Sequence, residues 1–210
     1  MRRQLVLNLE RQGLSDPVVL AALGAVERHR FVDSALVNQA YEDTSLPIGL
    51  AQTISKPSVV GRMLALLRQG CDGRLGRVLE IGTGCGYQAA VLSHLATEVY
   101  SIERLRALHD RARQNLRHLK LGHVHLLFGD GRAGYARGAP YAGIIAAAGG
   151  EALPQAWLEQ LDLGGRLVAP VQTGVGAATQ ALVVVERTRS GFQRSLFEAV
   201  HFVPLKSGTD

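Results

Sequence analysis

The sequence lacks most of the features that would place it in a specialised class of protein. It has only two cysteines in 210 residues, Cys71 and Cys85, which are too few for a disulfide framework and lack the spacing of metal ligands. No stretch approaches the roughly 18 apolar residues that a membrane-spanning helix needs. Asn8, Glu10 and Arg11 interrupt the first apolar stretch well before it could form a signal peptide. We therefore expect a reduced, cytoplasmic protein that does not associate with membranes.

Familiar catalytic and metal-binding patterns are also missing. The seven histidines show no HxxxH spacing and no partner constellation, so we expect no metal site. No Ser-His-Asp order stands out as a catalytic triad. There are no internal repeats, and the 47% hydrophobic and 20% charged residues are ordinary for a globular protein. A chain of 210 residues predicts one domain.

The chain does carry an excess of basic residues. Its net charge is +5 and its isoelectric point is near 9.6, which raises the hypothesis of a nucleic-acid partner. Much of the excess lies in one stretch: Arg104, Arg106, Arg111, Arg113, Arg117 and Lys120. We interpret this stretch as a helix whose charges face solvent, because no aromatic-rich RNA-binding motif accompanies it. We therefore do not expect nucleic acid as a partner.

The first third of the chain is predicted to be helical around one irregular segment. One helix is expected over residues 2–12, ending at Gly13. A second is expected over residues 17–29, started by Ser15, Asp16 and Pro17. An irregular segment then covers residues 31–56, and an apolar helix covers 58–69.

From residue 77 onward, strand and helix patterns alternate. Strands are expected at 77–82, 98–103, 123–130, 141–148 and 164–171, and helices at 87–96, 105–119 and 153–161. Such alternation predicts an α/β fold with a doubly wound, mostly parallel sheet that helices cover on both faces. Residues 181–187 and 192–198 predict an antiparallel hairpin, and 200–205 a last strand.

The strongest local signal is the glycine loop LEIGTGCGY, residues 79–87. Gly82, Gly84 and Gly86 follow a strand and open a helix, where the chain must bend tightly and let a ligand approach the backbone. The dinucleotide fingerprint needs Gly-x-Gly-x-x-Gly, whereas the third glycine here comes one residue early. No lysine follows as in a P-loop. The loop therefore favours a cofactor without phosphates, such as S-adenosylmethionine.

Acidic residues end the next two predicted strands. Glu103 lies about 20 positions after Gly82, the spacing expected of a carboxylate that accepts both ribose hydroxyls; the alternative is a cap for the following helix. Asp130 and Gly131 end the third strand at the same sheet edge. An aspartate there can accept from an adenine amino group while the glycine leaves room for the ring, although Asp-Gly is also a common turn.

Four segments together resemble one known family in consistent order: AYEDTSLPIGLAQTISKP, VLEIGTGCGYQAAVL, GDGR and LPQAWLEQLDLGGRLVAPV. They resemble the protein-L-isoaspartate O-methyltransferases over about residues 10–206, and the QTIS loop is the specific part. The resemblance implies a Rossmann-like class I methyltransferase domain over 1–210. Within it, residues 1–70 would be a helical extension with the active-site loop, 71–171 the cofactor-binding core and 172–210 the C-terminal strands.

The resemblance also implies an activity. It is the S-adenosylmethionine-dependent methyl esterification of the free α-carboxylate of L-isoaspartyl residues, which initiates repair of damaged proteins. The implied partners are isoaspartyl-containing peptides and proteins, and we expect a monomer. Ser55 is the implied catalytic residue. The implied cofactor-binding residues are Thr53, Ile54, Glu80, Gly82, Thr83, Gly84, Gly86, Glu103, Asp130 and Gly131.

The chemistry explains why a serine is enough. Methyl transfer to a carboxylate is an in-line displacement whose nucleophile is already ionised at neutral pH, so no general base is required. Alignment of the reacting atoms and removal of water are what accelerate it. We expect Ser55 to be a positioning donor rather than a nucleophile, held in a loop between Pro47 and Pro57. The alternative role for Ser55 is a cap for the helix after Pro57.

The sequence departs from the family pattern at several positions. The family often has serine at Cys85 and threonine at Ala89, a histidine or aromatic residue where this chain has Ser58, and threonine at Lys206. These changes affect the substrate contacts more than the cofactor contacts. Two other functions stay open: a methyltransferase of the same fold with another acceptor such as RNA, and a catalytically idle relative that binds cofactor or peptides.

Overall fold

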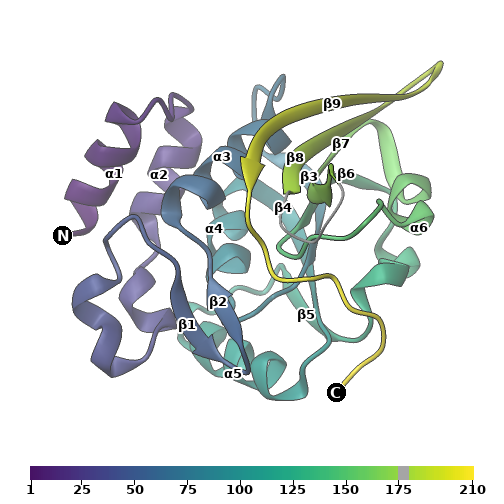
Figure 1. Cartoon of the computed structure of the whole chain (residues 1–210). Coiled ribbons are helices and arrows are strands. Elements are labelled where there is room, and N and C mark those ends of the chain that lie inside the picture. Colours follow the sequence, from purple (N-terminus) through teal and green to yellow (C-terminus); the bar gives the residue numbers. More distant parts are fainter. Residues whose placement is uncertain (175–179) are drawn as a thin grey trace.

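The computed structural model describes residues 1–174 and 180–210. In this part of the chain, seven strands form one sheet in the order β5-β4-β3-β6-β7-β8-β9, and β1 and β2 form a separate hairpin (Figure 1). The first five of the seven are parallel, and β8 and β9 follow β7 as antiparallel neighbours. The bounds are β3 Leu75–Ile81, β4 Ala96–Glu103, β5 Val124–Phe128, β6 Tyr141–Ala146, β7 Leu161–Gln172, β8 Gln180–Thr188 and β9 Gly191–Val200. The predicted mostly parallel α/β sheet is confirmed.

The two faces of the sheet pack into two apolar cores. Alternate residues of each strand enter different cores, as the pleat requires: Val168 of β7 belongs to one, Leu167 and Ala169 to the other. The larger core includes side chains of α3 Pro57–Arg68, α4 Tyr87–Leu95 and α5 Arg106–Leu116. The short helix α6 Gln155–Glu159 places Trp157 in the other. The helices thus cover both faces, as the alternating pattern predicts.

The N-terminal helices form as expected except at one end. Helix α1, Arg2–Arg11, stops before Gly13, which has φ +98°. Helix α2, Pro17–Ala25, begins at Asp16, whose carboxylate accepts from two backbone N–H groups. The prediction that this second helix continues to residue 29 is wrong. The chain becomes extended at the buried Val26, and a 3₁₀ turn, Arg28–Phe31, then directs both of its end residues into the interior. Figure 1 shows α1 and α2 outside α3, on the side of the sheet away from α6.

The segment expected to be irregular contains a strained hairpin. Strands β1, Leu46–Gly49, and β2, Gln52–Ile54, pair antiparallel across a two-residue turn. Both turn residues, Leu50 and Ala51, have left-handed backbone angles, with φ +52° and +55°. Such turns normally use asparagine and glycine, because a side chain makes this conformation unfavourable. The hairpin therefore stores local strain.

Ala51→Gly is expected to stabilise the protein by about 0.5–1 kcal/mol, because glycine adopts positive φ without a steric penalty. Urea denaturation of the variant measures the change. The matched control is Ala21→Gly on the exposed face of α2, which should destabilise by about 1 kcal/mol because glycine weakens a helix. A loss of stability in both variants would contradict the assigned strain.

Residues 200–205 do not form the predicted last strand. Val200 ends β9, and the chain then leaves the sheet. Gly149 donates to the carbonyl of Val203 and accepts from the amide of Leu205, at 2.9 and 2.8 Å. These two bonds flank Pro204, and the pairing stays an isolated parallel bridge. In Figure 1 this segment runs down the front of the sheet to the C-terminal end.

The basic helix is only partly a solvated face. Arg106, Arg113, Arg117 and Lys120 are exposed as expected. Arg111, however, donates to the carbonyl of Ile48 in the hairpin at 2.7 Å. Arg104 donates to the carbonyl of Gly208 and to the Asp210 carboxylate, each at 2.9 Å. These two arginines therefore hold other segments against α5 rather than facing solvent.

No helix of residues 1–174 and 180–210 is long and apolar enough to cross a membrane. Within the same ranges, no group of three or more His, Cys, Asp and Glu side chains could hold a metal ion. Cys71 and Cys85 are both free thiols.

Candidate active site

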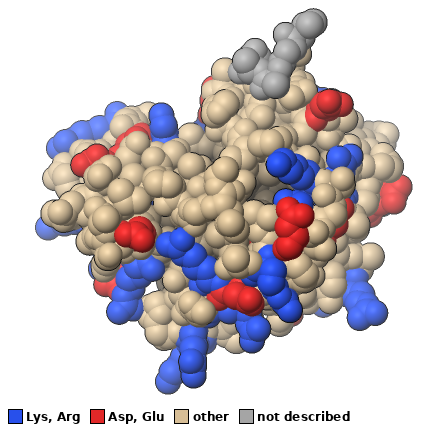
Figure 2. Space-filling view, turned by 60° about the horizontal axis from the view of Figure 1, so that its bottom comes forward, with Lys and Arg blue, Asp and Glu red and all other residues tan. Residues whose placement is uncertain are grey.

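A cleft of about 700 Å³ opens at the carboxyl edge of the parallel strands. The chain turns away from the sheet there after β3, β4 and β6, so residues distant in sequence come together. Its walls come from the glycine loop with Glu103, the β1–β2 hairpin, the residues around the start of α5, and the C-terminal residues 203–206 with Asp210. Figure 2 shows basic side chains, with acidic ones among them, on the face that carries the lower part of Figure 1. The volume is that of a typical small-molecule site.

Glycine is required at two places around this cleft. Gly84, with φ +56°, lies where an added Cβ would come within 3.2 Å of the Ile48 side chain. At Gly131 an added Cβ would come within 2.6 Å of the Ile81 side chain, which is too close for any real contact. The missing Cβ atoms at Gly84 and Gly131 thus make room for the side chains of Ile48 and Ile81, and both glycines also line the cleft.

Glu103 lies at the end of β4 with its carboxylate directed to the glycine loop. Its two oxygens accept from the Gly84 amide at 2.8 Å and the Leu105 amide at 3.0 Å. Each carboxylate oxygen has a second lone pair, so both can still accept from a ligand hydroxyl. Glu103 is buried at 5% exposure yet lines the cleft. Glu103 thus holds the glycine loop and the residue before α5 in place, and its oxygens remain available to ribose hydroxyls.

A small inner cavity of about 40 Å³ adjoins the cleft. The two share the residues Ile48, Thr53, Gly82, Gly84 and Ala147 in their walls. The inner cavity is also lined by Ile54, Ser55, Thr83, Tyr87 and Gln88, among others. It has room only for a few small polar atoms, such as a carboxylate or ordered water.

Ser55 stands at this inner cavity with a free hydroxyl. Within residues 1–174 and 180–210, no hydrogen bond to the Ser55 side chain forms. The alternative role of a helix cap is wrong, because α3 has Lys56 at its N-cap and no side-chain cap bond. The Ser58 amide near that end is instead bound by the Asp43 carboxylate at 2.8 Å. The hydroxyl of Ser55 is therefore available to a ligand.

Glu80 lies beneath the glycine loop, fully buried. Ser101 donates to one Glu80 oxygen, and Ser101 and Thr83 share a hydrogen bond of 2.6 Å. The other Glu80 oxygen has no partner. Burial raises the pKa of Glu80 to about 8. Burial thus favours the protonated form of Glu80, whose side chain is linked through two hydroxyls to the loop.

Three of the predicted site residues line neither cavity: Glu80, Gly86 and Asp130. Gly86 begins α4 with φ +91° and packs against Ala112 and Leu116. The two oxygens of Asp130 accept from the Arg132 amide at 2.9 Å and the Gly208 amide at 2.7 Å. All the other predicted site residues line the cleft or the inner cavity.

Sequence reasoning missed three contributors to the cleft. They are the hairpin residues Ile48, Leu50 and Gln52, the residues around the start of α5 (Arg104 to Leu108 and Asp110), and the C-terminal residues Val203 to Lys206 with Asp210. The sequence does not predict the hairpin, because the Leu50–Ala51 turn has none of the residues that normally mark one. The sequence analysis noted Lys206 as a departure from the family pattern but did not place it in the cleft.

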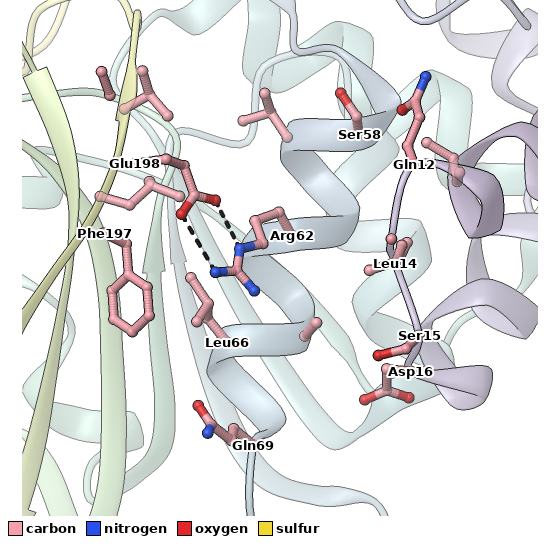
Figure 3. A pocket seen from close by; sticks show the side chains of 17 residues that line it. Gln12, Leu14, Ser15, Asp16, Ser58, Arg62, Leu66, Gln69, Phe197 and Glu198 are labelled. Carbon is pink, nitrogen blue, oxygen red and sulfur yellow. Dashed lines mark hydrogen bonds and ion pairs between the residues drawn. The ribbon is translucent and has the colours of Figure 1, made fainter.

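A second hollow, about 730 Å³, lies between α3, β9 and the turn after α1 (Figure 3). A bidentate ion pair spans it, with Arg62 Nε 2.7 Å from Glu198 Oε1. Figure 3 shows Phe197 beside this pair and Ser58 and Gln12 near the rim. It contains no glycine loop and no buried unpartnered polar group. The cleft with its inner cavity is therefore the better candidate.

The site fits a nucleoside that carries a charged amino-acid tail. Glu103 offers acceptors for ribose hydroxyls, and Gly82, Gly84 and Gly131 line the cleft without side chains of their own. Tyr87 and Gln88 line the inner cavity. Among the described residues, Tyr87 Oη and Gln88 Nε2 are buried without hydrogen-bond partners. Buried polar groups are rarely left unpaired unless a ligand or water satisfies them.

Comparison with known proteins agrees with this geometry. The family model for protein-L-isoaspartate(D-aspartate) O-methyltransferase (PCMT) matches residues 1–210. A protein-L-isoaspartate O-methyltransferase of Methylibium petroleiphilum is 60% identical over 212 residues, covering 100% of this chain and 78% of its own length. One of Leptothrix cholodnii is 60% identical over 210 residues, with 99% and 74% covered.

Solved structures are similar over almost the whole chain. A protein-L-isoaspartate O-methyltransferase superposes with a TM-score of 0.87 at 28% identity, covering 98% of this chain and 66% of its own. A beta-aspartate methyltransferase (PCMT) from Plasmodium falciparum, in complex with S-adenosyl-L-homocysteine, has a TM-score of 0.84 at 22% identity and 98% coverage of both chains. The second similarity bears on the fold alone.

Proposed function

Because the chain belongs to the protein-L-isoaspartate(D-aspartate) O-methyltransferase family, we propose that it methylates the free α-carboxylate of L-isoaspartyl residues in proteins. S-adenosylmethionine is the methyl donor, and the ester formed initiates repair. The observation that carries the proposal is the match of the whole chain to this family. The free hydroxyl of Ser55 at the inner cavity, in the loop on which the family resemblance is most specific, supports it.

The residues of the site have separate tasks in this reaction. S-adenosylmethionine, when bound, supplies a methyl group on a positively charged sulfur. Glu103 and the glycine loop hold the nucleoside, and Thr53, Ile54 and Ser55 line the space where donor and acceptor meet. The Ser55 hydroxyl donates to one oxygen of the acceptor carboxylate and leaves the other to attack. No residue removes a proton, because the acceptor is already ionised at neutral pH.

One assay tests the proposed activity. Labelled S-adenosylmethionine is incubated with an isoaspartyl peptide and with its normal aspartyl twin. We expect base-labile methyl ester on the isoaspartyl peptide only. Label on both peptides, on neither, or on added RNA would refute the proposed acceptor.

Glu103→Ala is expected to weaken S-adenosylhomocysteine binding by about 100-fold, because the two hydrogen bonds that a buried carboxylate accepts from the ribose are lost. Calorimetry measures the dissociation constant. The matched control is Asp110→Asn, an exposed carboxylate that also lines the cleft, for which we expect a change of less than about threefold. Unchanged affinity in Glu103→Ala would remove this residue from the site.

The proposal extends to the organisation of the enzyme. We take residues 1–210 as one domain, because Leu5 and Leu9 of α1 belong to the same apolar core as Val184 of β8 and Phe202. We also take it to act as a monomer on isoaspartyl-containing peptides and proteins. A cytoplasmic location agrees with two free cysteines, since reducing compartments keep thiols unpaired. Light scattering of the purified protein tests the monomer.

A further inference from the structure

A third hollow, which we call the basic groove, lies between β5 and α5 with the turn that follows this helix. It has a volume of about 900 Å³ and meets the cleft only at Asp110, which lines both. Its walls combine the cations Arg113, Arg117 and Lys120 with the apolar side chains of Leu121, Val124 and Leu126. Figure 2, which turns the bottom of Figure 1 forward, shows basic side chains gathered on this side of the molecule.

The basic groove has positive charge that the protein itself does not neutralise. Arg113, Arg117 and Lys120 are exposed, and within residues 1–174 and 180–210 none of them forms an ion pair. Among the described residues that line the groove, Asp110 alone is acidic, and its carboxylate lies 4.0 Å from Arg106 Nε. Three free cations beside apolar surface favour an anionic ligand.

The strand under these cations has an open edge. β5 is the outermost strand on its side of the sheet, so within the described ranges only β4 pairs with it. The Val99 amide donates to the His123 carbonyl, and the Gly129 amide donates to the Glu103 carbonyl. Backbone groups alternate in direction along a strand, so residues 123, 125, 127 and 129 face β4 and Leu126 faces outward. The N–H and C=O of Leu126 can therefore pair with an added strand.

Three kinds of occupant can be compared with this groove. A second copy of the chain, paired through β5, would bring two sets of the same cations together in a protein whose net charge is +5. Single-stranded RNA is held by bases that stack on aromatic rings, and among the described residues no aromatic side chain lines the groove. An extended peptide with acidic side chains satisfies both the open backbone groups and the cations.

We propose that the basic groove binds an extended, acidic segment of a protein partner, which adds to the sheet as a strand beside β5. The segment pairs its backbone with Leu126 and directs acidic side chains at alternate positions toward Arg113, Arg117 and Lys120. Because Asp110 lines both the groove and the cleft, a partner bound in this way is held beside the active site. The inference rests on the groove and does not depend on which acceptor is methylated.

Fluorescence anisotropy with a labelled peptide tests the charge preference. The probe has about ten residues in which glutamate alternates with valine, and its twin has lysine in place of glutamate. We expect saturable binding of the glutamate probe only. Binding of neither peptide, or of both equally, would overturn the proposal.

Charge reversal locates the binding surface. The double variant Arg113→Glu, Arg117→Glu should weaken binding of the glutamate probe by more than about tenfold, because attractive contacts become repulsive. The matched control is Arg132→Glu, Arg137→Glu, which makes the same change in net charge at two exposed arginines outside the groove. We expect less than about a threefold effect from it, since salt screens distant charges. Equal losses in the two double variants would show attraction by net charge alone and would refute the site.

Two methylated forms of the probe test strand pairing. One carries N-methyl groups on the glutamate amides and the other on the valine amides. Only alternate amides of an added strand face β5, so one form should bind more than about tenfold more weakly and the other should stay within about threefold of the probe. Equal affinities of the two forms would rule out strand addition. If an oligouridylate bound more tightly than the glutamate probe and lost binding in Arg113→Glu, Arg117→Glu, the groove would belong to nucleic acid and the proposal would be wrong.

Discussion

Ser55→Ala is expected to lower kcat for isoaspartyl peptides by about 10²- to 10³-fold, the usual effect of removing one positioned hydrogen-bond donor. The Ser55 hydroxyl has no hydrogen-bond partner among the residues that the structure describes, so alanine removes no such bond from the loop. The dissociation constant for S-adenosylhomocysteine should change by less than about threefold, because Glu103 and the glycines remain. Steady-state kinetics and calorimetry on the same preparation measure the two quantities.

The control for this substitution is Ser58→Ala, three residues further along. Its side chain lies at the second hollow and its amide, bound by Asp43, is kept in the variant (Figure 3). We expect less than about a threefold change in kcat. If turnover and cofactor affinity fell together in Ser55→Ala, the residue would be part of the cofactor site rather than a donor to the acceptor.

Replacing Glu80 by glutamine is expected to change how stability depends on pH. The folded protein keeps the Glu80 proton up to about pH 8, whereas the unfolded chain loses it near 4.5. Between these values the unfolded state binds fewer protons, so the wild-type protein loses stability as pH rises. Each pKa unit corresponds to about 1.4 kcal/mol, so the loss is on the order of 4 kcal/mol by pH 8. Glutamine has no proton to lose and should remove this part of the dependence.

Urea denaturation at pH 5, 6, 7 and 8 measures the effect as a difference between the two proteins. The free energies of unfolding should be similar at pH 5 and diverge in favour of Glu80→Gln toward pH 8. The matched control is Glu42→Gln, an exposed carboxylate whose curve should follow that of the wild type. Parallel curves for wild type and Glu80→Gln would show that Glu80 is ionised in the folded protein.

Short-range information in the sequence determined the core of the fold and half of the site. The alternating apolar strands and helices required a parallel sheet, because that is how β-α units bury apolar runs. The positions of Gly82, Gly84, Glu103 and Gly131 follow from the same pattern, since parallel strands present their carboxyl ends at one edge. The sequence alone shows these features, because the backbone angles at glycines and at the ends of strands depend mainly on neighbouring residues.

Only the tertiary structure decided which distant groups meet at that edge. The Leu50–Ala51 turn has no local signal, because neither residue prefers left-handed backbone angles. The adjoining strand is held by the Arg111 bond to Ile48, which joins residues far apart in the sequence. The chain leaves the sheet after Val200, and residues 203 and 205 bond to Gly149, which lies more than 50 positions earlier in the sequence. Arg28 is buried against the ring of Tyr87, 59 positions later in the sequence, and no periodicity marks a buried cation. Side-chain burial and charge balance are properties of the packed chain, and they set the chemistry of the inner cavity.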